Sequence, residues 1–473
     1  MNHHSYFATR DSRRVECAIT GTGGFGRSFL AQARRVPGLS CRIAVDVDAA
    51  IAARVLASVG INPAEIAECS DAASARVAWD QGKAIAAADL AHVADLPFEV
   101  LLEATGNPEA GARHALIAII ADRHVVMVTK ETDSVIGPIL ARLATERGRV
   151  VTPVDGDQPS LLIGLVTWAQ VVGLSVVSAG KSSEYDFVFD PAQGTITSNG
   201  RSIAAPGFSD WLAAGDRPWA QVAAARARLA SALPQRAVPD LCEMTVVANA
   251  LGMMPDRADL HAPIARIPEI ADLMALNADG GLLRGRGQLD VFHCLRLPDE
   301  PSFAGGVYVT VRCEDGDTWD MLRDKGHVVA RNGRTAMLGL PRHLLGLEAA
   351  TSVFEAALLG RSSGGLNPQP VIDLTAHADR DLKAGTILHA QGHHHSIADV
   401  SGRMTPAMVL SDDAPIPYYL AAGRRLLSDV PAGSAILCGD VELDEASALL
   451  SLRRLQDRVM LQADLVDPLA RRA

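Results

Sequence analysis

Three glycines form the motif with the most specific chemistry in the sequence. Gly21, Gly23 and Gly26 make the pattern G-x-G-x-x-G, which follows an apolar run and precedes a helical pattern over residues 27–36. In that context the first glycine permits a tight turn, the second lets the backbone approach a pyrophosphate, and the third lets the helix pack against the strand. The helix N-terminus directs free N–H groups toward the phosphates. We therefore predict that a dinucleotide binds at Gly21, Gly23, Gly24, Phe25 and Gly26.

An acid follows the next predicted strand at the distance that a dinucleotide site requires. Residues 40–46 form an apolar run that ends at Asp46, 20 residues after Gly26. A carboxylate at this place binds the ribose 2′-OH of NAD. Asp48 lies close by and no Arg or Lys stands next to the two acids, so a 2′-phosphate would meet negative charge. We expect the cofactor to be NAD or NADP, with NAD favoured; the alternative is a glycine-rich turn without a nucleotide.

Two lysines occur at the ends of predicted strands, where nicotinamide and substrate would meet. Lys130 follows an apolar run at residues 124–128, and Lys181 follows another at residues 175–179. Hydride transfer to or from a C–OH group needs a residue that takes or gives the proton on oxygen. A lysine can polarise a carbonyl, and burial can lower its pKa enough for proton transfer. We predict that both lysines are catalytic; the alternative for each is a surface lysine in solvent.

Four acids are further candidates for the catalytic site: Glu131, Asp133, Asp157 and Glu243. Carboxylates of this kind could bind a divalent metal or a polyol, so a divalent metal is considered as a second cofactor without an assigned ligand set. The alternative is solvated charge and helix capping. Asp133 stands before Ser134 and a helix predicted over residues 135–147, so an N-cap and a functional role are equally supported there.

Residues 393–395 are three consecutive histidines in the C-terminal part of the chain. On a strand, consecutive side chains point to alternating faces, so the three cannot all bind one metal. A solvated or interface role is favoured over a metal site.

Composition restricts the partners. The chain has 473 residues, of which 48% are hydrophobic and 21% charged, as in ordinary globular proteins. Its net charge is −11 and no basic block occurs, which argues against a nucleic-acid partner. The seven cysteines are scattered without a C-x-x-C pair, which argues against a zinc finger or a disulfide scaffold and fits a cytoplasmic protein.

No segment resembles a signal peptide or a membrane span. The N-terminus lacks an apolar core segment. The most apolar run, residues 160–179, is interrupted by Trp168, Gln170 and Gly173 and divides into a helix and a strand. We expect buried α/β core there and no membrane partner.

Strands and helices alternate regularly from residue 15 to about residue 157, including a predicted helix over residues 111–121. This alternation predicts an α/β fold with a Rossmann-type doubly wound parallel sheet, and a dinucleotide-binding domain at residues 1–157. Ligands of such sheets bind at the carboxyl ends of the strands. Thr105 and Gly106, which end an apolar run, are therefore added to the cofactor site.

The character of the sequence changes after the predicted sheet. Residues 158–360 mix alanine-rich helices with strands and predict an α+β domain for substrate binding and oligomerisation. A Gly/Pro-rich linker at residues 361–370 precedes short strands and turns. We predict a small β-rich domain at residues 371–445 and a C-terminal helix at residues 444–462.

Several motifs resemble known families. The dinucleotide fold with Glu103-Ala-Thr-Gly106 and residues 125–130 (VVMVTK) resembles the homoserine dehydrogenase family. Residues 381–385 (DLKAG) and 430–433 (VPAG) resemble a SAF domain. The combination is similar to the SAF-domain oxidoreductases, which include the 1-deoxy-D-xylulose 5-phosphate reductoisomerase-like family of isoprenoid biosynthesis. Features of that enzyme type recur at Glu131-x-Asp133, Gly156-Asp157-x-Pro159, Lys181 and Glu243.

The resemblance implies an NAD(P)-dependent oxidoreductase. Its substrate would be a small polar hydroxy or keto compound, with or without a phosphate. The alternatives are a reductoisomerase-like enzyme, which would use NADPH and a metal, and a non-enzymatic nucleotide-sensing module. Asp46 and Asp48 depart from the cationic groups that NADPH would need, whereas Lys130 follows the homoserine dehydrogenase pattern. We expect a homo-oligomer whose partner is a small-molecule substrate.

Overall fold

The structure is a computed structural model that describes residues 3–7, 13–392 and 395–462. The chain divides into two compact units. Unit 1 joins Met1–Ser160 to Leu344–Ala473, and unit 2 is Leu161–His343. The predicted boundary near residue 157 lies close to the first junction, whereas the three-domain division stays a prediction. Of the three histidines singled out in the sequence, His393 and His394 lie outside the described residues.

The first sheet of unit 1 has seven strands in the order β3-β4-β2-β1-β5-β6-β7. Every pairing in it is parallel. The strand order reverses around β1 and β5, which is the arrangement of a Rossmann-type doubly wound sheet, as the sequence predicted. Its strands are β1 (Val15–Thr20), β2 (Leu39–Val45), β3 (Ile66–Cys69), β4 (Ala84–Ala87), β5 (Val100–Glu103), β6 (His124–Met127) and β7 (Val151–Pro153).

Five helices connect these strands: α2 (Gly24–Ala33), α3 (Ala49–Ser58), α4 (Ala72–Asp80), α5 (Pro108–Ile120) and α6 (Lys130–Glu146). Short polar side chains begin several of them. Asp48 accepts a hydrogen bond from the backbone of Ala50 at the start of α3, and Asn107 caps α5. These caps satisfy N–H groups that have no partner within the helix. The helix expected over residues 111–121 therefore begins earlier, at Pro108.

Helix α6 corrects a sequence prediction. It begins at Lys130 rather than at residue 135, and the residue before it is Thr129. Asp133 consequently lies inside the helix, and the N-cap role considered for it is wrong. Glu131 and Asp133 precede the predicted helix but belong to the first turn of the observed one. Acids in a first turn stabilise a helix, because they interact with the positive end of the helix dipole.

The core of the first sheet contains residues from a distant part of the chain. Apolar side chains of β1, β2 and α2 pack with Ala349, Ala350 and Val353, the last two from α13 (Ala350–Phe354). These three residues follow unit 2 in the sequence. The segment that follows unit 2 in the sequence therefore completes the core of the first sheet.

Unit 2 contains a mixed sheet, in agreement with the predicted α+β domain. Its main strand order is β11-β10-β9-β14-β8-β15-β17-β16, with β12 and β13 also paired to β14. The strands are β8 (Val176–Ser182), β9 (Phe187–Asp190), β10 (Thr195–Ser198), β11 (Arg201–Ala204), β12 (Met254–Pro255), β13 (Ile264–Ala265), β14 (Gln288–Arg296), β15 (Val307–Arg312), β16 (Val328–Val329) and β17 (Thr335–Leu340). Its helices are α8 (Ser209–Leu212), α9 (Trp219–Leu229), α10 (Val238–Leu251), α11 (Ile270–Leu273) and α12 (Gly316–Asp324), while α7 (Gln158–Val171) crosses the junction.

The last part of unit 1, which we call the C-terminal module (residues 371–462), is built from short strands and turns. Strand β18 (Ile372–Ala378) pairs with β21 (Val400–Pro406), and β19 (Ala390–Gln391) pairs with β20 (Ser396–Ile397). Two helices follow, α14 (Tyr418–Ala421) and α15 (Ala448–Gln456), and a π-helical turn over Asp457–Leu461 extends α15. A bridge between Leu382 and Val430 joins the two glycine-turn segments, residues 381–385 and 430–433, that resemble a SAF domain.

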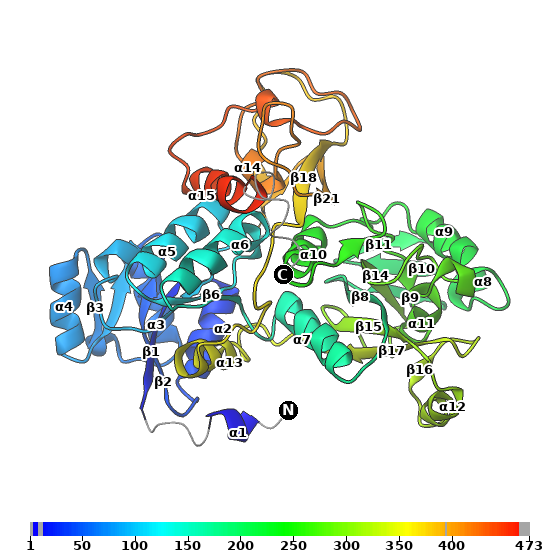
Figure 1. The fold of residues 1–473 in the computed structure, drawn as a ribbon, viewed down its shortest axis with the longest axis horizontal. Helices are drawn as coiled ribbons and strands as arrows, with labels where there is room; N and C mark the ends of the chain where they lie inside the picture. The colour runs from blue at the N-terminus through cyan, green and yellow to red at the C-terminus, as the bar shows by residue number, and fades with distance from the viewer. Residues whose placement is uncertain (1–2, 8–12, 393–394, 463–473) are drawn as a thin grey trace. The chain divides into compact units, whose positions relative to one another are not determined.

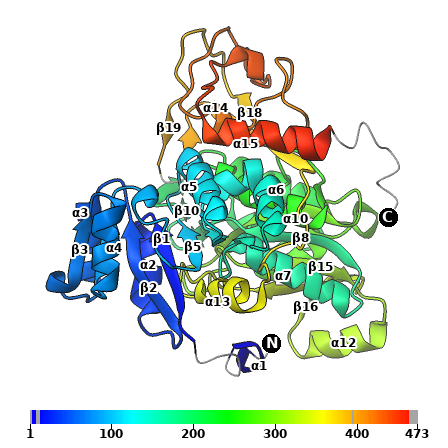
Figure 2. The same ribbon diagram turned by 60° about the vertical axis from the view of Figure 1, so that its left-hand side comes forward.

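Hydrogen bonds attach the C-terminal module to the first sheet's helices, and α15 lies over α5 and α6 in both views (Figures 1 and 2). Glu109 of α5 accepts hydrogen bonds from Ser447, Ala448 and Leu449. Gln456 accepts from the backbone N–H of Ile139 at 3.2 Å and donates to the carbonyl of Val135 at 3.1 Å. Pro138 lies within α6 at this point, and a proline has no N–H group to donate. The glutamine side chain therefore hydrogen-bonds to backbone groups beside the proline.

In the described part of the chain, every helix is too short or too polar to cross a bilayer.

Candidate functional site

The glycine loop between β1 and α2 has no room for side chains at two of its glycines. Gly21 has a φ of +84°, and a Cβ there would lie 2.4 Å from the carbonyl oxygen of Ala104. A Cβ at Gly26 would lie 2.1 Å from the carbonyl oxygen of Gly21. Gly23 differs, because a Cβ there would meet nothing within 4 Å. The first and third glycines are thus required by packing, whereas the second borders open space.

Asp46 is fixed at the end of β2 by the glycine loop. Its Oδ2 accepts hydrogen bonds from the backbone N–H of Thr22 at 2.8 Å and from the Thr22 hydroxyl, and its Oδ1 accepts from the N–H of Val47 at 2.8 Å. Thr22 was not among the cofactor residues predicted from the sequence. The carboxylate is therefore held beside the loop while lone pairs remain for a ligand hydroxyl.

A cavity of about 640 Å³ opens at the carboxyl ends of β1, β2, β4 and β5. Gly21, Gly23, Asp46 and Thr105 of the predicted cofactor residues line it. The others lie beside it: the side chain of Phe25 packs against the core cluster, and the N–H of Gly106 donates to the Thr129 hydroxyl at 2.9 Å. The volume lies in the range of small-molecule and cofactor sites.

A buried acid lies next to this cavity. Glu103, the last residue of β5, has no exposed surface and accepts a hydrogen bond from the Thr105 hydroxyl at 2.6 Å. His114 of α5 approaches the same carboxylate at 3.3 Å and lines the cavity. In the sequence, Glu103 stands out only as part of the motif at residues 103–106 and no pattern indicates His114, because their pairing depends on how α5 packs against the sheet.

Lys130 and Asp157 form an ion pair at the carboxyl edge of the first sheet. The Lys130 Nζ lies 3.2 Å from Oδ2 and 3.3 Å from Oδ1 of Asp157. The lysine follows β6 and the aspartate follows β7, and these strands are neighbours. Asp157 is 5% exposed at its side chain and Lys130 is 18% exposed, so the pair is largely shielded from solvent.

Two further predicted acids belong to the first turn of α6. Glu131 is buried. Asp133 is half-buried and its carboxylate lies against Gly137, one turn along the helix. Burial raises the pKa of Asp133 to about 7. A carboxyl with this pKa can exchange a proton near neutral pH, which fits an acid–base role better than a cap.

Lys181 lies in unit 2, within a buried cluster of charges. Its ammonium is 2.9 Å from Oδ1 of Asp240 and also contacts Oε2 of Glu243, both from α10. Ser183 donates a hydrogen bond to the other oxygen of Asp240 at 2.7 Å. The lysine side chain is 1% exposed, so the alternative of a solvated surface lysine is wrong for Lys181.

The predicted catalytic residues therefore form two groups. Lys130, Glu131, Asp133 and Asp157 belong to unit 1, whereas Lys181 and Glu243 belong to unit 2. Asp240 was missed, although its position three residues before Glu243 places both acids on one face of a helix. Among the described residues, no group of three His, Cys, Asp or Glu side chains is arranged to hold a metal ion.

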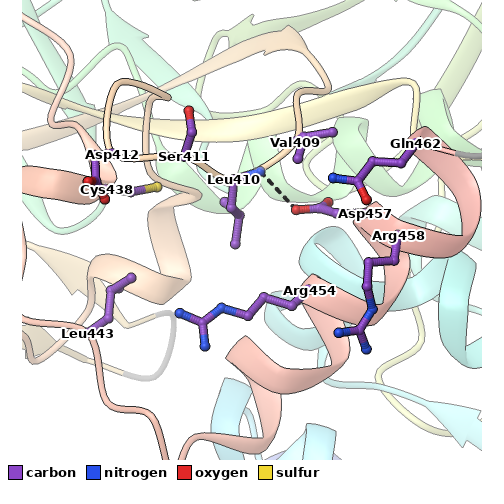
Figure 3. Close-up of a pocket in the computed structure, with 10 residues that line it drawn as sticks. All are labelled: Val409, Leu410, Ser411, Asp412, Cys438, Leu443, Arg454, Asp457, Arg458 and Gln462. Carbon is purple, nitrogen blue, oxygen red and sulfur yellow. Dashed lines mark hydrogen bonds between the residues drawn. The ribbon is translucent and has the colours of Figure 1, made fainter. Parts of the chain in front are cut away.

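A second cavity, of about 310 Å³, lies within the C-terminal module (Figure 3). It contains none of the residues predicted from the sequence. Asp457 in its wall accepts a hydrogen bond from the N–H of Leu410 at 2.9 Å and an ion pair from the buried Arg453. Arg454, which also lines it, is paired with Glu445. These contacts tie α15 to the rest of the module.

Comparison with known proteins gives one family match. Residues 230–349 match the model of the family described as oxidoreductase DRL, catalytic domain. The matched segment contains Asp240 and Glu243 of the lysine cluster. No curated protein matches the sequence. The oxidoreductase class predicted from the sequence is thus the class of the matched family.

Several solved structures are similar to parts of the chain. A DOX-P reductoisomerase in complex with magnesium is 16% identical with a TM-score of 0.27, over 36% of this chain and 46% of that one. An NAD-binding oxidoreductase from Klebsiella pneumoniae is 17% identical with a TM-score of 0.25, over 38% and 44%. A myo-inositol dehydrogenase from Lactobacillus casei, bound to NAD(H) and myo-inositol, is 12% identical with a TM-score of 0.27, over 37% and 47%. The chain spans about half the length of each of these proteins.

Proposed function

We propose that the protein is a nicotinamide-dependent oxidoreductase that transfers a hydride between NAD(H) and a small polar hydroxy or keto compound. The observation that carries this proposal is Asp46, which borders the cavity beside the glycine loop and is held there by Thr22. A fixed carboxylate at this place suits the ribose hydroxyls of the cofactor. The match of residues 230–349 to an oxidoreductase family supports the same class.

The charges around the cavity favour NAD over NADP. Among the described residues that line it, none is Lys or Arg. A 2′-phosphate would therefore lie near the carboxylate of Asp46 without a lysine or arginine to balance its charge. The ribose of NAD offers a hydroxyl instead, which can donate to Asp46.

Bound NAD(H) would supply or accept the hydride at its nicotinamide ring. When the substrate is reduced, its carbonyl oxygen must gain a proton. We assign that proton to Lys130, whose ammonium is oriented by Asp157. Asp133, with its pKa near neutrality, is a second group that can move a proton in this unit. Glu131 also belongs to the proposed catalytic set, because it lies beside Lys130 in the first turn of α6.

Lys181 and Glu243 stay in the proposed catalytic set through the buried cluster that they form with Asp240 in unit 2. The ammonium is held by both carboxylates, and charges in a buried network interact more strongly than exposed ones do. The proposal includes substrates that carry a phosphate and substrates that do not.

The finer identity that we propose is a homoserine dehydrogenase-like oxidoreductase with a SAF-like C-terminal module. The motifs at residues 103–106 and 125–130 support the first part, and the linked glycine turns at Leu382 and Val430 support the second. A homo-oligomer, a cytoplasmic location and the absence of nucleic-acid and membrane partners stay predictions.

A reductoisomerase-like enzyme is the second candidate, supported by the motifs at Glu131-x-Asp133 and Gly156-Asp157-x-Pro159. It would need NADPH and a metal. Asp46 opposes NADPH. Asp240 and Glu243 already bind Lys181, and the described residues offer no group of three such ligands for a metal. A non-enzymatic nucleotide sensor is less well supported, because such a module needs no paired lysines.

Titration of the protein with NADH and NADPH, followed by cofactor fluorescence, tests the proposal. We expect NADH to bind more tightly, and Asp46→Ala to reduce the difference. Asp80→Ala, at an exposed acid outside the cavity, is the matched control and should leave the preference unchanged. Equal or tighter binding of NADPH to the wild-type protein would favour the reductoisomerase-like candidate. A substrate screen with the preferred cofactor then tests hydride transfer itself.

A further inference from the structure

The cavity at the glycine loop has one wall that does not come from the first sheet or its helices. His395, from the C-terminal module, lines it together with residues of the glycine loop and of α5. The residue is half-buried and has a φ of +47°, and its N–H donates to the carbonyl of Gly392 at 3.3 Å. It lies directly before β20, the second strand of the short β19–β20 hairpin. A residue near the hairpin's turn therefore reaches the cavity.

The position of His395 is supported from two sides. After it, the N–H of Ile397 donates to the hydroxyl of Tyr418 at 2.7 Å, and Tyr418 is completely buried. On the other side of the module, Ser447 and its neighbours are bound by Glu109 in the first turn of α5. The start of the same helix, at Asn107, borders the cavity. The module is thus fastened to the helix that forms the cavity wall, and Figure 2 shows β19 on the side of the module nearest α5.

One part of the cavity lies where a dinucleotide site receives the adenosine half of its ligand. Its walls include Asp46 and Ile51 after β2 and Ala88 after β4, and these strands lie on one side of β1. In a doubly wound sheet this side receives the ribose that the acid binds and the base attached to it. Lys130 and Asp157 follow β6 and β7, on the other side of β1, and neither lines the cavity.

We propose that His395 contacts the adenosine part of the bound cofactor, so that the C-terminal module completes the cofactor site. The flat ring of a histidine can stack on a purine. His114, which faces the same cavity from α5 and is paired with Glu103, supplies a second imidazole. This inference rests on the proposed function, because it takes the ligand of the cavity to be NAD(H).

The test compares His395→Ala with His389→Ala, an exposed histidine of the same module that does not line the cavity. Binding of NADH and of ADP-ribose, which lacks nicotinamide, is measured by calorimetry for the full chain. We expect His395→Ala to weaken both ligands by the same factor of about ten, which corresponds to 1.4 kcal/mol. His389→Ala should bind both as tightly as the wild-type protein does.

Three results would overturn the inference. Unchanged affinity of His395→Ala for ADP-ribose would remove His395 from the adenosine site. A loss for NADH alone would place it at the nicotinamide end. A wild-type protein that binds neither ligand would refute the proposed function itself, and this result is distinguishable because it does not depend on any variant. A melting temperature of His395→Ala within about 2 °C of wild type establishes that the variant is folded.

Discussion

Glu109 accepts three hydrogen bonds from the first turn of α15, from residues that lie 338 to 340 positions further along the chain. A carboxylate at the start of a helix satisfies free N–H groups and interacts favourably with the positive end of the helix dipole. Glu109 itself lies in the first turn of α5, two residues after the cap residue Asn107. One acid therefore joins the starts of two helices from opposite ends of the sequence.

Removing this acid should loosen the C-terminal module. We expect Glu109→Ala to lower the free energy of unfolding by about 1–2 kcal/mol, the upper part of the range for a lost helix cap. Urea unfolding followed by circular dichroism measures the change. Glu146→Ala, at an exposed acid paired only with Arg142 on the same helix, should change stability by less than about 0.5 kcal/mol. Equal effects of the two variants would show that the Glu109 contacts do not stabilise the fold.

Lys130 is predicted to act in catalysis rather than in cofactor binding. Lys130→Ala should lower turnover by about a hundredfold or more, the scale of positioned acid–base catalysis. Affinity for NADH should change little, because the lysine does not line the cavity at the glycine loop. Lys130→Arg should not restore the rate, since guanidinium is larger and does not give up its proton. Single-turnover experiments measure the rate of hydride transfer in both variants. A near wild-type rate for Lys130→Ala would show that another group donates the proton.

The buried cluster around Lys181 gives a prediction about stability. Lys181→Met removes the cation that pairs with Asp240 and Glu243. Leaving buried carboxylates without it should cost about 3–5 kcal/mol. The double variant Lys181→Met/Glu243→Gln should recover part of that loss, because one negative charge is removed with the cation. Denaturant unfolding of both variants decides it; additive losses would show that the two residues are not coupled.

His124 makes the stability of unit 1 depend on pH. Burial and the nearby Arg149 lower the pKa of His124 to about 4, and its Nδ1 accepts a hydrogen bond from the N–H of Val150 at 3.1 Å. The unfolded chain therefore takes up this proton first, so the contribution of His124 is present above pH 6.5 and is lost as the pH falls toward 4. The loss is about 3 kcal/mol, from 1.36 kcal/mol for each unit of pKa.

The variant His124→Asn isolates this contribution, because its amide oxygen can accept the same hydrogen bond without titrating. Unfolding free energies measured at several pH values from 4 to 7 should fall less steeply with acid in the variant than in the wild type. Asp290, whose pKa burial raises to about 6, acts in the opposite direction but equally in both proteins. Parallel pH profiles would contradict the assignment.

The parts of the fold and site that depend on local sequence were predictable. The glycine loop, Asp46 and the alternating strands carry short-range patterns, and the parallel sheet follows from them. The start of α6 was not predictable, because Glu131 and Asp133 are compatible with a loop as well as with a first helical turn. Thr22 lies within the glycine motif, but its bonds to Asp46 depend on tertiary packing. His114 and His395 acquire their places only through such packing, and no spacing in the sequence links them to the cavity. Asp240 could have been predicted, because its spacing of three residues from Glu243 can be read from the sequence.

The placement of Ala349, Ala350 and Val353 in the core of the first sheet affects how the protein is made. A ribosome that adds about 5–20 residues per second translates residues 161–343 over roughly ten to forty seconds. Throughout that time the first sheet has left the ribosome with part of its apolar core uncovered. A chain that stops before residue 349 never covers it, so truncated products of this gene should be substrates for chaperones and proteases rather than partly active enzymes.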